Sequence, residues 1–366
     1  MADTIHVLGL GGVGILVAHA LAGVPNRPPL NLLLHRPREY HSQLLAVNRD
    51  GAIEYQGGFS IEEYRNGCWY QEASRSSAQP AKHTMSQKIP SNDTPIRLLI
   101  VAVKAHHTVD SLRLLKHRLS KYSTILFLQN GLGVLDELDH ALFPIPSERP
   151  YYMSAIVKHC VHREDFLSAS HTVMGSITLG TSPRIPRASK SHMSLQPPAG
   201  ADRLISVLIQ ASILNVSVLS PRELLRQQLI KITTNSVHNP LTSLLECSVN
   251  GLIASHNPQV QAISDALVSE FSNVIKALPI QELSDKEDSE TDFSPANLKR
   301  TIYQIGLRAG EHTTSMLQDI RKGLKTEIMY LNGYFMRWAL NLGIECPVND
   351  IITRMVLEKE HRTAGK

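Results

Sequence analysis

The sequence predicts an α/β protein in which a doubly wound parallel sheet (residues 1–220) is followed by an all-α domain (residues 221–366). Three observations predict this architecture. A glycine-rich turn follows the first apolar segment, apolar strands then alternate with helical stretches, and helical periodicity alone continues from about Pro221. The length of 366 residues also exceeds what one ordinary core organises, which favours two domains.

The first domain opens with the short apolar strand Ile5–Leu8. The next strand, Leu30–Leu34, is an unbroken apolar run of the kind that a parallel strand buries on both faces. Further strands are expected at 97–103, 123–128 and 216–219, and helices at 15–22, 108–119 and 202–211. The stretch 55–95 fits this pattern poorly, and we interpret part of it as an insertion or excursion. We interpret 182–200 and 284–296 as loops or excursions.

The composition is typical of a globular cytoplasmic protein. The 37 basic and 33 acidic residues leave a net charge of +4, which favours anionic small molecules only weakly. The sequence contains no basic stripe interleaved with aromatic residues, so nucleic-acid binding is not predicted. No apolar run is long enough to cross a bilayer. We expect no signal peptide, because an apolar strand begins at Ile5, and the four distant cysteines suit a reducing compartment. We expect no metal, because the run 158–162 lacks further ligands at useful spacing.

The turn after the first strand predicts a Rossmann-like dinucleotide site. Gly9 permits the tight turn, Gly11 lets a pyrophosphate approach the backbone, and Gly14 lets the helix pack on the strand. The N-terminus of the helix adds free N–H groups and the positive end of its dipole. A tight turn without a ligand is the alternative interpretation. The whole turn reads Gly9-Leu10-Gly11-Gly12-Val13-Gly14.

The end of the second strand predicts which cofactor binds. NAD enzymes usually carry an acidic residue there for the ribose hydroxyls, whereas this chain has Arg36 and, in reserve, Arg38. A guanidinium binds a 2′-phosphate through two parallel hydrogen bonds. We therefore expect NADPH/NADP+, with Arg36 as the first candidate. Arg38 is equally well explained as a solvated loop charge.

Two further loops follow later strands. Lys104 could contact a cofactor phosphate or ribose, and Asn130 could bind the ribose or the nicotinamide. Strand carboxyl ends are where such sheets bind ligands. Considered alone, both residues are ordinary loop residues.

The helical half contains a polar stripe. Lys231, Asn235 and Asn239 are spaced four residues apart, so they drift by only about 40° per step around a helix and share one face. A lysine beside two carboxamides suits an anionic substrate that carries a carbonyl group, although a solvent-facing polar stripe has the same pattern. Pro240 is expected to kink or end this helix directly after Asn239.

A second polar group includes Ser315 and Glu327. On one straight helix these residues would lie about 18 Å apart, too far to contact one small substrate. Gly323 lies between them, and Thr326 could cap a new helix. We therefore predict a break near Gly323 that lets both ends face the cleft.

These motifs together resemble the 2-dehydropantoate 2-reductase (ketopantoate reductase) family, and in particular its longer eukaryotic, fungal-like members. The resemblance runs through both domains in order. It rests on the Gly9–Gly14 turn, Val103-Lys104-Ala105, Gln129-Asn130-Gly131-Leu132-Gly133, Lys231-x3-Asn235-x3-Asn239-Pro240-Leu241-Thr242, Ser315-Met316-Leu317-Gln318-Asp319-Ile320-Arg321 and Thr326-Glu327-Ile328.

The resemblance implies NADPH-dependent reduction of a 2-keto acid by a monomer or homodimer, in pantothenate biosynthesis. Lys231 would be the general acid and Glu327 would lie beside the reaction centre. Ser315 would bind the substrate carboxylate. One extra residue separates Asn239 from Asn250, which departs from the family spacing. The substrate would also be oriented by Asn235, Asn239 and Asn250, and the cofactor held by Arg36, Lys104 and Asn130.

Two alternatives remain open. The substrate could be ketoisovalerate or another branched 2-keto acid in place of ketopantoate. The chain could also be a non-catalytic homologue that only binds NADP(H), because a fold alone does not determine a function.

Overall fold

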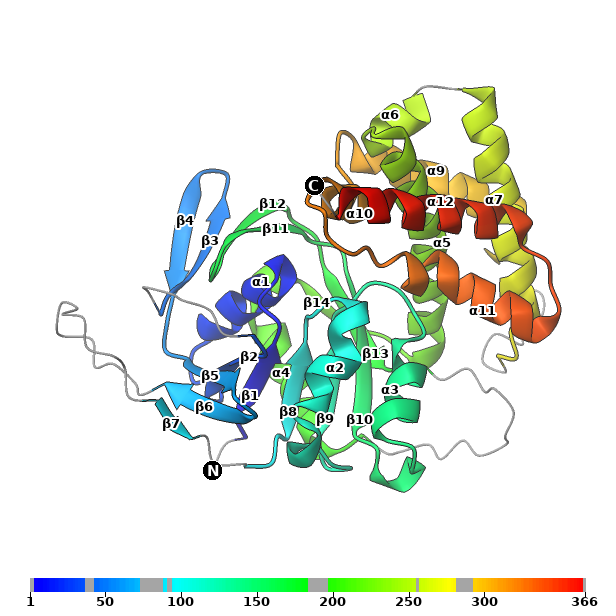
Figure 1. Cartoon of the computed structure of the whole chain (residues 1–366). Helices are drawn as coiled ribbons and strands as arrows, with labels where there is room; N and C mark the ends of the chain where they lie inside the picture. Colours follow the sequence, from blue (N-terminus) through cyan, green and yellow to red (C-terminus); the bar gives the residue numbers. More distant parts are fainter. Residues whose placement is uncertain are drawn as a thin grey trace. The chain divides into compact units, whose positions relative to one another are not determined.

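The computed structural model describes residues 3–36, 43–72, 88–90, 94–183, 197–254, 257–280 and 292–364 (Figure 1). The chain forms two compact units. The first comprises Met1–Gln129, Asp136–Ser182 and Met193–Ser220, and the second comprises Asn130–Leu135, Pro183–His192 and Pro221–Lys366. The short loop that begins at Asn130 therefore belongs with the helical unit.

The first unit is built on a ten-stranded sheet in the order β14-β13-β10-β9-β8-β1-β2-β5-β6-β7. The strands from β10 to β5 are all parallel, and in chain order they give the 3-2-1-4-5-6 arrangement of dinucleotide-binding folds. The predicted fold class is confirmed. These parallel strands are β1 (Ile5–Leu8), β2 (Leu30–Leu34), β5 (Ser60–Arg65), β8 (Leu98–Val101), β9 (Thr124–Phe127) and β10 (Tyr151–Val157). The sheet is extended by β6 (Cys68–Glu72) and β7 (Lys88–Pro90) on one side and by β13 (Ile177–Thr181) and β14 (Val216–Val218) on the other.

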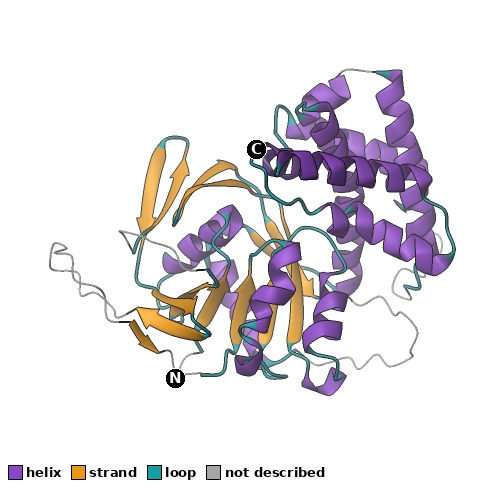
Figure 2. Cartoon of the chain, in the orientation of Figure 1, coloured by secondary structure: helices purple, strands orange, loops and turns teal. Residues whose placement is uncertain are grey.

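A second, four-stranded sheet covers the first helix. Helix α1 (Gly12–Ala22) packs on the large sheet through one side and on the small sheet through the other (Figure 2). Its residues from Gly14 to Leu21 are all buried, which is why its sequence is apolar all round. The small sheet has the order β11-β12-β3-β4, with β3 (Leu45–Arg49), β4 (Ala52–Gln56), β11 (Cys160–Asp165) and β12 (Ser168–Val173).

The stretch 55–95, part of which was expected to be an excursion, contributes strands to the large sheet where the structure describes it. Strand β5 pairs in parallel with β2 as a member of the large sheet. Its polar Glu62 is buried because Arg118 Nη1 contacts its carboxylate at 2.6 Å and Asn31 Nδ2 donates to it at 2.5 Å. Paired charges are tolerated inside the protein, but they erase the apolar pattern of a strand. Residues 73–87 and 91–93 lie outside the described residues.

The helices of the first unit differ from their predicted bounds. The expected helix 108–119 stops early, as α2 (Thr108–Arg113), and a 3₁₀ turn, Lys116–Arg118, brings the buried Arg118 guanidinium to Glu62. Helix α3 (Val134–Leu142) follows β9, and α4 (Ala199–Gln210) begins three residues before the predicted 202. Of the expected loop 182–200, residues 184–196 lie outside the described residues.

The described part of the second unit is helical (Figure 2). Its core is formed by apolar side chains from α5, α7, α9, α11 and α12, among them the stacked rings of Phe271 and Phe335. Residues 284–291 of the expected 284–296 excursion lie outside the described residues. The helices are α5 (Pro221–Leu245), α6 (Val249–Ala254), α7 (Pro258–Ala277), α9 (Pro295–Ala309), α10 (Ser315–Arg321), α11 (Asn332–Leu342) and α12 (Pro347–Thr363).

No helix within the described ranges combines the length and apolarity that crossing a membrane would require.

Candidate active site

The predicted cofactor residues of the first unit meet at the carboxyl edge of its sheet. Strand register places Leu8 level with Leu33 on one side and with Val101 on the other. Gly11, Arg36 and Lys104 each come three residues after one of these positions. Neighbouring parallel strands end at the same edge, so the three residues lie in loops that begin side by side at that edge.

The glycine turn leaves room for a ligand at one position. Gly9 has a φ of +99°, and a Cβ there would lie 2.6 Å from the backbone nitrogen of Val103. A Cβ on Gly14 would lie 1.9 Å from the carbonyl oxygen of Gly9. At Gly11, in contrast, a Cβ would meet nothing within 4 Å. Gly9 and Gly14 are thus required by packing, whereas the protein itself places no such demand on Gly11.

The N-terminus of α1 lies directly beside this space. Gly11 is the N-cap residue, and no side chain caps the helix. The first turn of α1 contains no acidic residue, so its N–H groups and the positive end of the helix dipole are not neutralised by the helix's own side chains. This arrangement fits a phosphate group.

The two basic candidates differ in exposure. Arg36 is exposed directly after β2, whereas Lys104 is half-buried as the N-cap residue of a short 3₁₀ turn. The Lys104 carbonyl oxygen accepts hydrogen bonds from the His107 N–H at 2.9 Å and from Thr108 Oγ1 at 3.4 Å. Thr108 Oγ1 in turn accepts from Gln129, at the end of β9. The reserve candidate, Arg38, lies outside the described residues.

In the second unit, the helix does not end at Asn239, which was one of the two outcomes expected from Pro240. Helix α5 continues to Leu245, so Lys231, Asn235 and Asn239 lie on one continuous helix. Pro240 has no N–H to donate to the carbonyl oxygen of Ser236, four residues earlier. Asn332 Nδ2 donates to that oxygen instead, at 2.9 Å. The helix survives its proline because another helix supplies the missing donor.

A hydrogen bond between Thr314 and α5 holds the neighbouring residue Ser315 close to this helix. Thr242, which lies within about 20° of Lys231 around α5, contacts Thr314 Oγ1 through its own Oγ1 at 2.8 Å. Thr242 Oγ1 also donates to the carbonyl oxygen of His238 at 2.7 Å. Thr314 also caps α10, and Ser315 is the exposed residue that follows it. Ser315 is therefore held beside the Asn239 end of the polar stripe.

Asn250 is held by the turn that precedes Ser315. Its backbone N–H donates to the carbonyl oxygen of Gly310 at 2.9 Å, and its Nδ2 donates to Glu311 Oε1 at 2.7 Å. Asn250 lies on α6, so these bonds bring a third segment of the unit to the start of α10.

The predicted break near Gly323 is confirmed. Helix α10 ends at Arg321, and Gly323 has a φ of +62°. The chain then forms a 3₁₀ turn, Ile328–Tyr330, that begins directly after the half-buried Glu327. Thr326 anchors the approach to this turn, because its N–H and its hydroxyl both donate to Glu360 Oε2, at 2.8 and 2.7 Å.

The same turn holds the loop that contains Asn130. The Leu132 N–H donates to the carbonyl oxygen of Tyr330 at 2.9 Å, and the Tyr330 N–H donates to that of Glu327 at 2.9 Å. A Cβ on Gly131 would lie 2.5 Å from the Tyr330 carbonyl oxygen, so the close approach requires glycine. Asn130 and Glu327 therefore flank one small hydrogen-bonded structure.

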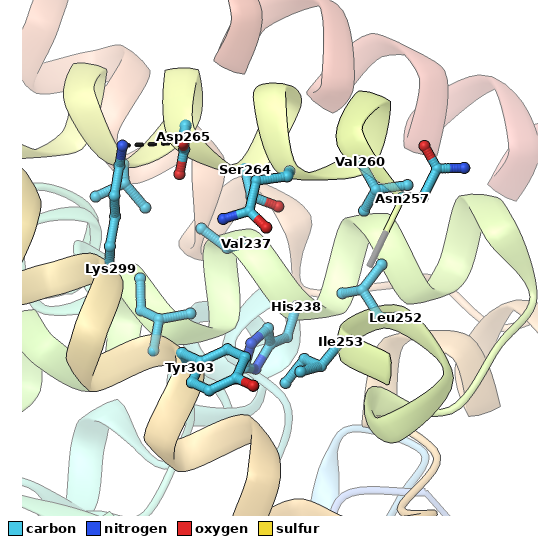
Figure 3. A pocket seen from close by; sticks show the side chains of 13 residues that line it. Val237, His238, Leu252, Ile253, Asn257, Val260, Ser264, Asp265, Lys299 and Tyr303 are labelled. Atoms are coloured by element: carbon cyan, nitrogen blue, oxygen red, sulfur yellow. Dashed lines mark ion pairs between the residues drawn. The ribbon is translucent and has the colours of Figure 1, made fainter. Parts of the chain in front are cut away.

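A separate hollow of about 100 Å³ lies between α5, α6, α7 and α9 (Figure 3). His238 points into it, and burial lowers the pKa of this histidine to about 4, so its imidazole is neutral at pH 7. Lys299 and Asp265 form an ion pair of 3.0 Å at its edge. None of the predicted site residues lines this hollow.

His159, in the run 158–162, has a structural explanation. His159 Nε2 bonds to the carbonyl oxygen of Leu214 at 3.0 Å, and His159 Nδ1 accepts from the Gly175 N–H at 3.0 Å and bonds to His171 Nε2 at 3.0 Å. The described residues contain no cluster of three or more His, Cys, Asp or Glu that could hold a metal.

Sequence reasoning missed the residues that hold the site together. Glu311 and Asn332 act through partners that are distant in the chain, so no local pattern marks them. Thr242 belongs to a motif quoted above, but its partner Thr314 is 72 residues away, so its role could not be assigned from the motif. Asn332 is the first residue of α11, where a polar residue is ordinary, so its place in the sequence gives no signal of its role.

Comparison with known proteins assigns the family. The family model "Ketopantoate reductase PanE/ApbA" matches residues 5–184, and "Ketopantoate reductase PanE/ApbA C terminal" matches residues 223–360. The chain belongs to the ketopantoate reductase family. The two matches cover both units in the order that the motifs predicted.

Individual relatives cover nearly the whole chain. A probable 2-dehydropantoate 2-reductase from Schizosaccharomyces pombe is 26% identical, over 98% of this chain and 96% of its own length. Ketoisovalerate reductase BEA2 from Gibberella fujikuroi is also 26% identical, over 96% of this chain and 82% of its own length. In fold, the chain is similar to D-mandelate dehydrogenase, solved with NADH and anilino(oxo)acetate, with a TM-score of 0.66 at 18% identity over 98% of this chain and 99% of that one.

Replacement of Asn332 tests the support of α5. We expect Asn332→Ala to lower the free energy of unfolding by about 2–5 kcal/mol, because it removes the donors to the Ser236 carbonyl oxygen and to Asn349 Oδ1 in a buried setting. Urea denaturation measures this change. Asn341→Ala, at an exposed position of the same helix, is the matched control and should change it by less than about 0.5 kcal/mol. Equal effects of the two variants would contradict the proposed support.

Proposed function

We propose that this chain reduces a branched 2-keto acid to the 2-hydroxy acid with NADPH, and that ketopantoate is its first substrate. The observation that carries the proposal is the unbroken α5 helix, which keeps Lys231, Asn235 and Asn239 on one face with Ser315 attached beside it. The relatives named 2-dehydropantoate 2-reductase support the choice of ketopantoate.

Ketoisovalerate is the second candidate substrate. A relative of nearly equal similarity is a ketoisovalerate reductase. Both acids have a carboxylate next to a ketone and a branched carbon next to that ketone, so the stripe and Ser315 suit either of them.

The dinucleotide would bind at the carboxyl edge of the sheet in the first unit. The space at Gly11 and the uncapped start of α1 would receive its pyrophosphate. Arg36, exposed three residues beyond Leu33, would bind the 2′-phosphate that distinguishes NADPH from NADH. Lys104 and Asn130 would contact the rest of the cofactor.

Each predicted site residue of the helical unit then has a chemical role. The bound nicotinamide supplies a hydride to the ketone carbon. Negative charge builds on the ketone oxygen, and the Lys231 ammonium stabilises this charge and donates the proton. Ser315 donates a hydrogen bond to the substrate carboxylate, while Asn235, Asn239 and Asn250 orient the rest of the substrate. Glu327 lies beside the reaction centre and holds a substrate hydroxyl or the cofactor.

Replacement of Lys231 tests the reaction. We expect the wild-type protein to oxidise NADPH when ketopantoate is added, and Lys231→Ala to lower kcat/KM by about 10²- to 10⁴-fold through loss of the proton donor. Absorbance at the NADPH band measures the rate. Lys359→Ala, which breaks an ion pair with Glu246 on the helical unit, should change kcat/KM by less than about 2-fold. Absence of turnover by the wild type with every 2-keto acid would refute the function, whereas a rate retained in Lys231→Ala would refute only the role of Lys231.

The cofactor site is tested by two variants with different expected signatures. Arg36→Ala should weaken NADPH binding by about 10-fold or more and leave NADH binding unchanged, because only NADPH has the 2′-phosphate. Gly11→Ala should weaken both dinucleotides alike, since its methyl group occupies the space where the pyrophosphate would lie. Calorimetric titration of the wild type and both variants with each dinucleotide measures the six affinities. An equal loss of NADPH and NADH in Arg36→Ala would contradict the assignment of Arg36.

A further inference from the structure

The carboxylate of Glu311 connects two residues at the start of α6. Its Oε1 accepts a hydrogen bond from Asn250 Nδ2 at 2.7 Å, and its Oε2 accepts one from Ser248 Oγ at 2.7 Å. Ser248 Oγ also accepts from the Gly251 N–H at 3.0 Å, as a cap of α6 does. One carboxylate therefore holds both a helix start and the side chain of a predicted substrate residue.

The chemistry of these groups determines which way the Asn250 amide points. An ionised carboxylate only accepts hydrogen bonds, so the Asn250 atom that faces Glu311 has to be the nitrogen. The hydrogen bonds from Asn250 and, next in size, from Ser248 lower the pKa of Glu311, which keeps the carboxylate ionised at neutral pH. The Asn250 oxygen, Oδ1, is then directed away from Glu311.

Asn250 Oδ1 is left as an acceptor for another molecule. Within the described residues, no protein group donates a hydrogen bond to it. Asn250 is also held at its backbone, where its N–H donates to the carbonyl oxygen of Gly310 at 2.9 Å. The acceptor is therefore fixed in place at both its main chain and its side chain.

We propose that Glu311 is a positioning residue for substrate selection: it orients Asn250 so that Oδ1 accepts a hydrogen bond from a hydroxyl group of the substrate. The proposal rests on the proposed 2-keto acid reductase function. It identifies the preferred substrates as 2-keto acids that carry a hydroxyl group, because an acceptor of this kind gains nothing from a purely aliphatic side chain.

Ketopantoate and ketoisovalerate are a suitable pair of probes, because ketopantoate has an additional hydroxymethyl group. A site built to bind a hydroxyl discriminates strongly against an analogue that lacks it, since its polar group then loses its partner. We expect the wild-type kcat/KM for ketopantoate to exceed that for ketoisovalerate by about 100-fold or more.

The experiment measures this ratio in a set of variants, with NADPH saturating. Asn250→Ala and Glu311→Ala should each reduce the ratio by about 10-fold. The reduction should come mainly from a higher KM for ketopantoate, and kcat/KM for ketoisovalerate should stay within about 3-fold of the wild type. The double variant should show no further reduction, because both changes remove one acceptor. Glu311→Gln should restore most of the ratio, since its Oε1 can still accept from Asn250 while its Nε2 donates to Ser248.

Glu358→Ala is the matched control, because Glu358 is an exposed glutamate that forms a helix-surface ion pair with Arg362. It should leave the ratio unchanged. A ratio unchanged in Glu311→Ala but reduced in Asn250→Ala would overturn the role of Glu311 while leaving the reductase function intact. An unchanged ratio in Asn250→Ala would overturn the hydroxyl contact. Wild-type protein that reduces neither acid would overturn the proposed function together with this inference.

Discussion

The helical unit depends on a side-chain hydrogen bond that replaces a missing backbone hydrogen bond of α5. Pro240 removes a backbone donor from the middle of α5, and Asn332 of α11 supplies a donor to the Ser236 carbonyl oxygen. Asn349 of α12 holds Asn332 in turn, through Asn332 Nδ2 to Asn349 Oδ1 at 2.9 Å and Asn349 Nδ2 to the Asn332 carbonyl oxygen at 3.0 Å. These buried hydrogen bonds link α5, α11 and α12 to one another. This arrangement keeps Lys231, Asn235 and Asn239 in register.

The proposed chemistry follows from that register. A general acid has to lie within hydrogen-bond reach of the oxygen that it protonates, and the carboxylate of the same substrate has to be bound at a fixed distance away. The Thr242–Thr314 bond ties the start of α10 to α5, so Ser315 moves with the stripe. The backbone bonds between Leu132, Tyr330 and Glu327 likewise tie the Asn130 loop to the position of Glu327.

Much of this arrangement could be predicted from local sequence, and the failures share a cause. The strand–glycine–helix start, the parallel strands and the spacing of Lys231, Asn235 and Asn239 are set by residues close in the chain. Strand β5 was missed because Arg118, 56 residues away, pairs with Glu62 and permits a charged residue inside the sheet. The continuation of α5 was missed because Asn332, 96 residues away, compensates for Pro240. The contacts of Glu311 with Ser248 and Asn250 are equally non-local.

The central claim is that the α5 face receives the reacting carbonyl group. A crystal structure with NADP+ and the 2-hydroxy acid product tests this most directly, because it locates the oxygen that is protonated in the reaction. The account predicts Lys231 Nζ at about 2.7–3.2 Å from the C2 oxygen of the hydroxy acid, with the carboxylate at Ser315. A hydroxy acid bound with its C2 oxygen beyond hydrogen-bond reach of Lys231, and with another proton donor beside it, would contradict the account.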